Sequence, residues 1–275
     1  ISSHCIRCID TDIQLFRINH ILCTKNKWIL NSGNSPKHPE FRLFCFPYSG
    51  GSASYYSGWN QLFGDNIEIL PIQYPGHETR ADEPLIPDVR ALAEAALEGI
   101  VPDTDMPFGF FGHSLGALVA FETAALFTEY ELDLPQMVFL SSAGTNFDRV
   151  QPPVHTLSGE ALKKTIITFG GVTSKDVLYT EAFDTFYAPL LINDFSAAET
   201  YQIRSGSVIH TPVHVFYGTE DAYVTAEDVQ KWKAHTDGGC SYDAFPGNHF
   251  YLNSQLETVC QKIKTMIEKD RNKVK

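Results

Sequence analysis

A serine flanked by two glycines is the sequence feature with the clearest chemical meaning. Residues 112–116 read Gly-His-Ser-Leu-Gly, with Ser114 directly after the apolar run FGFF and before the helix-like stretch LVAFETAALF. At a tight strand-to-helix turn, glycines let the backbone approach neighbouring chain closely and leave the serine hydroxyl exposed. A helix that begins at Leu115 also directs its first amide groups toward whatever the serine attacks. The pattern therefore predicts that Ser114 is a nucleophile.

Two late histidines are candidates for the base that a serine nucleophile requires, because a hydroxyl is too weakly acidic to attack unaided. Of the 10 histidines, only His235 and His249 follow the apolar run at 213–218. His235 falls inside the helix-like stretch TAEDVQKWKAHT, where we expect a solvated surface residue. His249 lies in PGNHFYL, a loop between the last apolar run and the last helical segment. Loops at strand ends can direct an imidazole over a sheet edge, which favours His249.

An acidic residue must orient the base, and chain order places it between the serine and the histidine. Asp221 follows the apolar run VHVFYG in the loop GTEDAYV, at the kind of strand end where catalytic groups of open α/β sheets collect. Glu220 is the neighbouring alternative. Asp148, in SSAGTNFD, is the distant alternative, since some hydrolases carry the acid one strand earlier. The order of the three groups favours Asp221.

A loop of small residues follows the first apolar run. Residues 43–53 read LFCFPYSGGSA, and the two glycines let the backbone come close to a ligand. One amide group of this loop, together with that of Leu115, would hold the oxyanion of a tetrahedral intermediate.

Six short apolar runs alternate with helix-length segments, which is typical of a mostly parallel sheet with helices on both faces. The predicted strands are RLFCF at 42–46, IEILPI at 67–72, FGFFG at 108–112, MVFLS at 137–141, VHVFYG at 213–218 and CSYDAF at 240–245. The predicted helices cover 88–100, 115–129, 225–236 and 252–268. Asp88 is the expected N-cap of the first helix.

Residues 152–205 interrupt this alternation, because they are rich in Pro, Thr, Phe and Tyr and contain helical pieces. We interpret them as a lid inserted between two strands. Residues 1–24 show no clear period and are expected to form a poorly ordered N-terminal extension. Residues 25–275 would then form a single domain.

Composition and charge narrow the functional class. The chain has 275 residues, 43% of them hydrophobic, and a formal net charge of −12. This acidic balance argues against nucleic acid as a partner, because phosphate binding needs a basic face. No stretch is long and apolar enough for a membrane span, and early charges argue against a secretory signal, which favours the cytoplasm. The CxxC at Cys5 and Cys8 lacks the second pair that a metal site needs, so no metal is expected.

Several segments together resemble the type II thioesterase family, the external thioesterases of fatty acid, polyketide and nonribosomal peptide synthesis. The similarity runs from about Trp28 to Ile267. The matching segments are the opening loop LFCFPYSGGSAS, YPGHETR at 74–80, FFGHSLGA, the acid loop GTEDAYV, the histidine loop GNHFYL and PLLINDFSAAETY at 189–201. Three positions depart from the family pattern, with His77 in place of Arg, Ser49 in place of Ala and Asn248 in place of Gly; none of them removes a catalytic group.

The resemblance implies an α/β-hydrolase fold in which Ser114 is the nucleophile, Asp221 the orienting acid and His249 the base. It also implies that the amides of Tyr48 and Leu115 form the oxyanion hole. The expected substrate is an acyl group on the phosphopantetheine arm of an acyl or peptidyl carrier protein, so phosphopantetheine belongs to the substrate and no cofactor is required. We expect the enzyme to be a monomer.

The apolar residues of the predicted lid would suit an aliphatic acyl chain. The predicted substrate-binding residues are Phe183, Phe186, Tyr187 and Leu190. A basic rim near Ser114 would help an acidic chain to bind an acidic carrier, and its candidate members are Lys163, Lys164, Lys175 and Arg80.

Two other functions remain open for this sequence. The same three groups would permit a carboxylesterase or lipase acting on oxygen esters. A non-catalytic binding module of the same fold is the second, although such a module has no need of all three groups.

Overall fold

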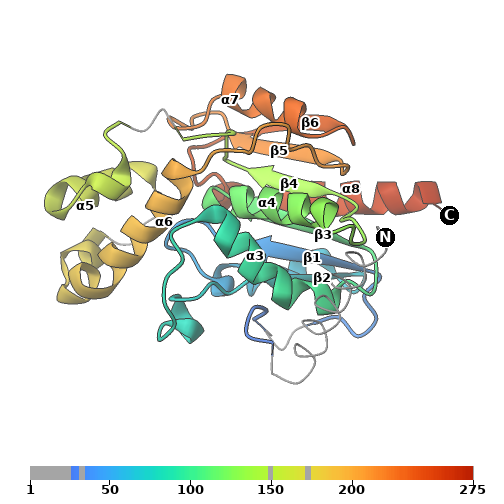
Figure 1. Cartoon of the computed structure of the whole chain (residues 1–275), viewed down its shortest axis with the longest axis horizontal. Coiled ribbons are helices and arrows are strands. Elements are labelled where there is room, and N and C mark those ends of the chain that lie inside the picture. Colours follow the sequence, from blue (N-terminus) through green and yellow to red (C-terminus); the bar gives the residue numbers. More distant parts are fainter. Residues whose placement is uncertain (1–25, 31–34, 148–150, 171–174, 275) are drawn as a thin grey trace, which may run out of the picture.

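A six-stranded sheet forms the centre of the computed structural model, which describes residues 26–30, 35–147, 151–170 and 175–274 (Figure 1). The strand order is β2-β1-β3-β4-β5-β6, and every neighbouring pair is parallel. This arrangement confirms the predicted parallel sheet flanked by helices. The predicted N-terminal extension, residues 1–24, lies outside the described residues.

The six strands coincide closely with the predicted apolar runs. Their bounds are β1 Phe41–Phe46, β2 Ile67–Pro71, β3 Phe108–His113, β4 Val138–Ser141, β5 Val213–Gly218 and β6 Cys240–Phe245. Strands of parallel sheets are covered on both faces, so they are apolar throughout rather than at alternate positions. β3 follows this rule, since all of its residues are buried.

Helices cover both faces of the sheet and build two separate cores. Along β1, Phe44 and Phe46 point to one core, and Leu43 and Cys45 point to the other, as expected from the alternation of side chains along a strand. The first core includes side chains of α3 (Val89–Ile100) and α4 (Leu115–Glu129). The second includes side chains of α2 (Asn60–Phe63) and α8 (Leu252–Val274).

The predicted helices are present, but two of them are irregular. The helical backbone of α8 is interrupted near its start by Gln255, which has a φ of −116° and a ψ of 15°. The carboxylate of Asp88 accepts a hydrogen bond of 2.7 Å from the amide of Ala91, which confirms it as the N-cap of α3. The predicted helix at 225–236 is an α-helical segment, α7 (Ala226–Gln230), that continues as a 3-10 turn, η7 (Lys231–His235). α8 continues six residues beyond the predicted end at 268, as far as Val274.

Helical segments occupy the interval between β4 and β5. They are η4 (Val154–Thr156), α5 (Gly159–Phe169), η5 (Lys175–Tyr179), the π-helix η6 (Phe183–Tyr187) and α6 (Ala188–Thr200). These segments, the inserted helices, have a small core of their own around Leu162, Ile166 and Phe183. Figure 1 shows α5 and α6 beyond one end of the sheet.

Short helical turns lie between the larger elements of the first half of the chain. They are η1 (Ala53–Tyr56), η2 (Glu78–Arg80) and η3 (Val101–Asp103). None of the helices in the described ranges combines the length and the apolar character needed to cross a membrane.

Candidate active site

Ser114 occupies a strained turn between β3 and α4. Its φ of 55° and ψ of −120° are unusual for a residue with a side chain. The two flanking glycines make this turn possible. A Cβ on Gly112 would lie 2.0 Å from the carbonyl oxygen of Gly116, and a Cβ on Gly116 would lie 2.1 Å from that of Phe46. The turn therefore has the close backbone contacts expected of the tight strand-to-helix turn that exposes a serine nucleophile.

His249 lies between Ser114 and Asp221 and contacts both. It follows β6 and is 2% exposed. Its Nε2 lies 3.0 Å from Oγ of Ser114, and its Nδ1 lies 2.8 Å from Oδ2 of Asp221. With Asp221 ionised, Nδ1 carries the proton and donates to the carboxylate, so Nε2 can accept the proton of the serine hydroxyl. The arrangement can therefore activate Ser114.

The Asp221 carboxylate is held on its other oxygen by the loop after β5. Its Oδ1 accepts hydrogen bonds from the amides of Tyr223 and Val224, at 2.9 and 3.1 Å. The side chain of Asp221 is fully buried, whereas the neighbouring Glu220 is exposed. The structure therefore favours Asp221 over Glu220, and Asp148 lies outside the described residues.

The competing histidine, His235, is in a different position. It lies at the end of η7, and its Nδ1 donates to the carbonyl oxygen of Ser207 at 3.3 Å. The expectation of a fully solvated side chain is wrong, because His235 is half-buried and its ring lies edge-on to those of Phe121 and Trp232. The hydrogen bond of His249 to Ser114 therefore favours His249 as the base.

A second buried histidine, next to His249, was not identified as a site residue from the sequence. His113 precedes Ser114, and its ring centroid lies 5.4 Å from that of His249. Burial, and secondarily the charge on His249, lowers the pKa of His113 well below its ordinary value. Its Nδ1 pairs with the hydroxyl of Ser141 at 2.9 Å, and this hydroxyl pairs with that of Tyr251 at 2.7 Å. A neutral His113 adds no positive charge that would oppose protonation of His249.

An apolar cavity of about 200 Å³ opens at Ser114 and His249. It is lined by the loop after β1 and by α5, η5, η6, α6 and the histidine loop. The other lining residues are Tyr48, Ser49, Gly50, Ile166, Phe169, Val177, Leu178, Phe183, Tyr187, Leu191, Phe195 and Phe250.

Only two of the four predicted substrate-binding residues line this cavity, namely Phe183 and Tyr187. Phe186 is 70% exposed, and Leu190 is half-buried outside the lining. The reason is the helical register. The lining positions 183, 187, 191 and 195 are four residues apart and form one continuous row along η6 and α6. The sequence prediction included Phe186 and Leu190, which stand one position before this row.

The predicted oxyanion donors flank the serine. Tyr48 lies in the loop after β1 and lines the cavity, and Leu115 is the first residue of α4. The first amides of a helix have no acceptor within the helix, so that of Leu115 is suited to a ligand oxygen. Within the loop, the amide of Gly51 donates to the carbonyl oxygen of Tyr48 at 2.8 Å, and the amide of Gly50 donates to Asp194 at 2.7 Å.

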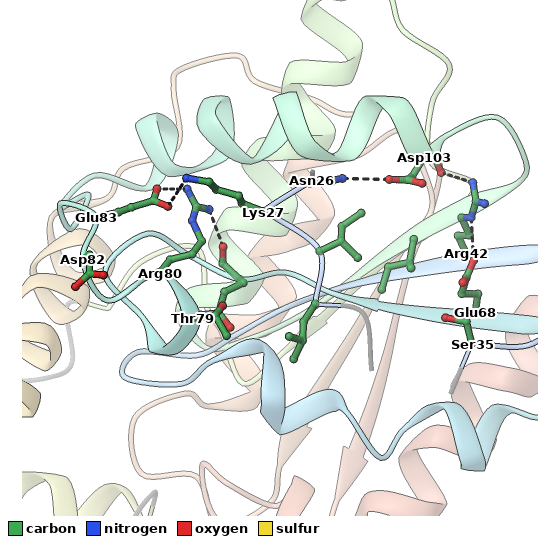
Figure 2. Close-up of a pocket in the computed structure, with 14 residues that line it drawn as sticks. Asn26, Lys27, Ser35, Arg42, Glu68, Thr79, Arg80, Asp82, Glu83 and Asp103 are labelled. Atoms are coloured by element: carbon green, nitrogen blue, oxygen red, sulfur yellow. Dashed lines mark hydrogen bonds and ion pairs between the residues drawn. The ribbon is translucent and has the colours of Figure 1, made fainter. Parts of the chain in front are cut away.

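A larger hollow, of about 750 Å³, lies beside β2 and shares no lining residue with the cavity at Ser114 (Figure 2). Its charged side chains largely neutralise one another. Arg80 pairs with Glu83 at 2.6 Å, and Arg42 pairs with Glu68 at 3.0 Å. We assign no role to this hollow.

Two members of the predicted basic rim are not available to a partner. Arg80 is buried with its guanidinium 4.2 Å from the ring of Trp28. Lys163 is also buried, and its Nζ lies 3.1 Å from a carboxylate oxygen of Asp184. Lys164, its neighbour on α5, is exposed. The side chain of Lys175 lies outside the described part of the structure.

Metal-binding side chains do not cluster in the described part of the chain, where no group of three or more His, Cys, Asp or Glu residues could hold an ion. The described cysteines, Cys45, Cys240 and Cys260, are free thiols.

Comparison with known proteins relates this chain to one enzyme family. A family model described as a thioesterase domain matches residues 41–267. The match begins at the first residue of β1, ends within α8, and includes Ser114, Asp221 and His249.

Individual relatives agree with this match. The chain is 33% identical over 230 residues to a probable cadicidin biosynthesis thioesterase of Streptomyces griseus, covering 84% of this chain but only 63% of that protein. It is 32% identical over 235 residues to the medium-chain S-acyl fatty acid synthase thioesterase of Homo sapiens, covering 83% and 87%. The solved structure of the type II thioesterase BorB, from the borrelidin biosynthetic cluster, is similar with a TM-score of 0.75 and 29% identity, covering 87% of this chain and 96% of that chain.

Proposed function

Because the chain belongs to the type II thioesterase family of the α/β-hydrolase fold, we propose that it hydrolyses acyl thioesters on the phosphopantetheine arm of an acyl or peptidyl carrier protein. Membership makes it a serine hydrolase that acts on thioesters. The observation that carries the proposal is the hydrogen-bonded series Ser114, His249 and Asp221, the first two of which line an apolar cavity.

The proposed reaction has two steps. In the first, Oγ of Ser114 attacks the thioester carbonyl carbon while Nε2 of His249 takes the hydroxyl proton. The carbon–sulfur bond then breaks, and the thiol leaves with the proton from His249. In the second step, His249 takes a proton from water, the hydroxide attacks the acyl-serine, and Oγ leaves with that proton as the carboxylic acid forms. Asp221 keeps the imidazole in the required tautomer throughout.

Amide groups would stabilise the oxyanion formed in each step. We assign this role to the amides of Leu115, the first residue of α4, and Tyr48, in the loop after β1 that lines the cavity together with Ser114. Such donors are worth most when the folded chain holds them in place before the reaction.

The acyl chain would occupy the apolar cavity. Its lining of phenylalanine, leucine and isoleucine side chains favours an apolar acyl group over a polar one. The inserted helices would then act as the lid of a single hydrolase domain. One related protein is named for cadicidin biosynthesis and another as a medium-chain thioesterase of fatty acid synthase, and both names are consistent with carrier-bound substrates.

The proposal extends to cofactors, oligomeric state, location and partners. The reaction uses only groups of the protein and water, so it requires no metal or organic cofactor, and phosphopantetheine is part of the substrate. The nucleophile, base and acid all come from one chain, which suits a monomer. We place the enzyme in the cytoplasm with a carrier protein as its partner, and without a nucleic acid or membrane partner.

Side-by-side assays test the substrate class. We expect an acyl-carrier thioester to be hydrolysed with a higher kcat/KM than the p-nitrophenyl ester of the same acyl group, with Ser114→Ala as the inactive control. A preference for the oxygen ester would instead identify a carboxylesterase. Failure of a fluorophosphonate probe to label the wild type would identify a binding module without catalysis.

A further inference from the structure

A buried histidine–aspartate pair lies outside the Ser114–His249–Asp221 series. His77 is 3% exposed and Asp194, on α6, is 2% exposed. Nε2 of His77 lies 3.0 Å from Oδ2 of Asp194, and its Nδ1 lies 2.9 Å from the carbonyl oxygen of Pro75. The pair joins the segment after β2 to the inserted helices, and the reaction described above makes no use of it.

The neighbours of the His77 ring determine how many protons it carries. A carbonyl oxygen and a carboxylate are both acceptors, so each ring nitrogen of His77 faces a group that cannot donate while Asp194 is ionised. A neutral imidazole has only one N–H and would leave a lone pair against one of these acceptors. The doubly protonated ring satisfies both contacts and neutralises the buried carboxylate.

Asp194 also holds the loop that follows β1. The oxygen that contacts His77, Oδ2, accepts the amide hydrogen of Gly50 at 2.7 Å. Leu191 lies three residues before Asp194 on the same face of α6 and packs against the same glycine. A Cβ added to Gly50 would lie only 2.4 Å from Cδ2 of Leu191. Gly50 has a φ of 75°, a conformation that glycine adopts without strain. The loop is therefore held at Gly50 by one polar and one apolar contact.

Gly50 belongs to the wall of the active-site cavity. Tyr48, Ser49 and Gly50 line it together with Ser114. We propose that doubly protonated His77 is a positioning residue, which holds Asp194 against the Gly50 amide and thereby fixes the loop that carries the oxyanion donor Tyr48. The catalytic meaning of this role rests on the proposed thioester hydrolysis, whereas the protonation of the pair does not.

Several groups act on the charge of His77. Burial alone would lower its pKa, but the hydrogen bond and charge of Asp194, the carbonyl of Pro75 and the charge of Glu78 together raise the pKa of His77 above 6.5. The Tyr74 ring lies edge-on at 5.8 Å, and burial, followed by the charge of Asp194, keeps its phenol neutral by raising the pKa of Tyr74 well above its ordinary value.

The raised pKa of His77 determines how the stability contributed by the His77–Asp194 pair changes with pH. A raised pKa in the folded protein means that the pair stabilises the fold fully below about pH 6.5, the ordinary histidine value. This contribution is lost as the pH rises through the pKa of folded His77. We therefore expect the loop to be held less firmly on the alkaline side, and kcat to fall there.

Two substitutions and a matched control separate positioning from general stability. His77→Gln keeps one donor but cannot become charged, and we expect about tenfold lower kcat at neutral pH, less than the ~10²–10³-fold effect of removing an oxyanion donor outright. His77→Arg keeps a charge at every pH and should restore much of kcat while removing the alkaline decline. The control is His210→Gln, which breaks an exposed pair with Asp237 and should leave the profile unchanged.

The decisive experiment uses the free enzyme and two readouts. Imidazole nitrogen shifts, followed by NMR against pH, should show His77 titrating above 6.5 in the wild type and lower in Asp194→Asn. The rate of Ser114 labelling by a fluorophosphonate should fall about tenfold in His77→Gln, because the phosphoryl oxygen needs the same amides as the thioester. A His77 ring that is neutral at pH 6.5, or labelling rates equal to those of the wild type, would overturn the proposal. A wild type that is labelled normally but hydrolyses no carrier thioester would instead refute the proposed function.

Discussion

The strand-end loops around Ser114 and the inserted helices between β4 and β5 are built on opposite principles. At the strand ends, the side chains of Asp221 and His249 are buried and hydrogen-bonded: the Asp221 side chain is completely enclosed, and both its oxygens accept hydrogen bonds. On the inserted helices, apolar side chains reach the surface, with Phe186 70% and Tyr179 61% exposed. Substitution of Asp221 or His249 would leave a buried hydrogen-bonding group without its partner, so large effects are expected there, whereas substitutions on the inserted helices should have graded effects.

The largest expected effect concerns the orienting acid. Asp221→Asn should lower kcat by about 10⁴-fold with little change in folding, because an amide in contact with Nδ1 of His249 favours the wrong tautomer. The measurement is steady-state kinetics together with thermal unfolding. Glu220→Gln, an exposed neighbour in the same loop, is the matched control and should keep wild-type activity. A large loss in Asp148→Asn, with none in Asp221→Asn, would place the acid one strand earlier.

An intermediate effect is expected from the cavity face of η6. Tyr187 lines the cavity and its neighbour Phe186 does not, although both side chains are more than half exposed. Tyr187→Ala should reduce kcat/KM for long acyl chains roughly tenfold, equivalent to about 1.4 kcal/mol of lost apolar contact, and spare short ones. Phe186→Ala should leave the whole acyl series unchanged. Equal effects of the two substitutions would mean that the acyl chain lies elsewhere.

The smallest effect concerns the approach of the carrier. Lys164 is exposed on α5, whereas the adjacent Lys163 is buried against Asp184 and would test packing rather than docking. Lys164→Glu should raise KM for a carrier-bound substrate about threefold at low salt and leave KM for a short soluble thioester unchanged. The control substitution is Lys269→Glu, because Lys269 is exposed near the C-terminal end of α8. Figure 1 shows the C-terminus at the end of the molecule opposite to α5. If both variants behave alike, the carrier binds away from α5.

The strand ends were predictable because their signals are local. Apolar runs marked all six strands, and the glycines around Ser114 marked the turn. The ordered positions of Asp221 and His249 then followed from the strands that precede them. Short-range features of this kind need no knowledge of distant contacts.

The inserted helices were predictable only as a segment. The helical register along η6 and α6 determines which side chains line the cavity, and composition does not reveal it, so the predicted substrate-binding residue Phe186 lies outside the lining. Lys163 was wrongly expected at the surface because Asp184, its partner, is 21 residues away. The contact of His77 with Asp194 joins residues 117 positions apart, so no local sequence pattern predicts it.

Transfer of the acyl group to Ser114 is tested most directly by mass spectrometry of the intact enzyme. The wild type, quenched during turnover of an acyl-carrier thioester, should gain the mass of the acyl group, and peptide mapping should place it on Ser114. Ser114→Ala should acquire no adduct and lose turnover while unfolding at the wild-type temperature. An acyl group found on another residue, or turnover retained by Ser114→Ala, would contradict the account.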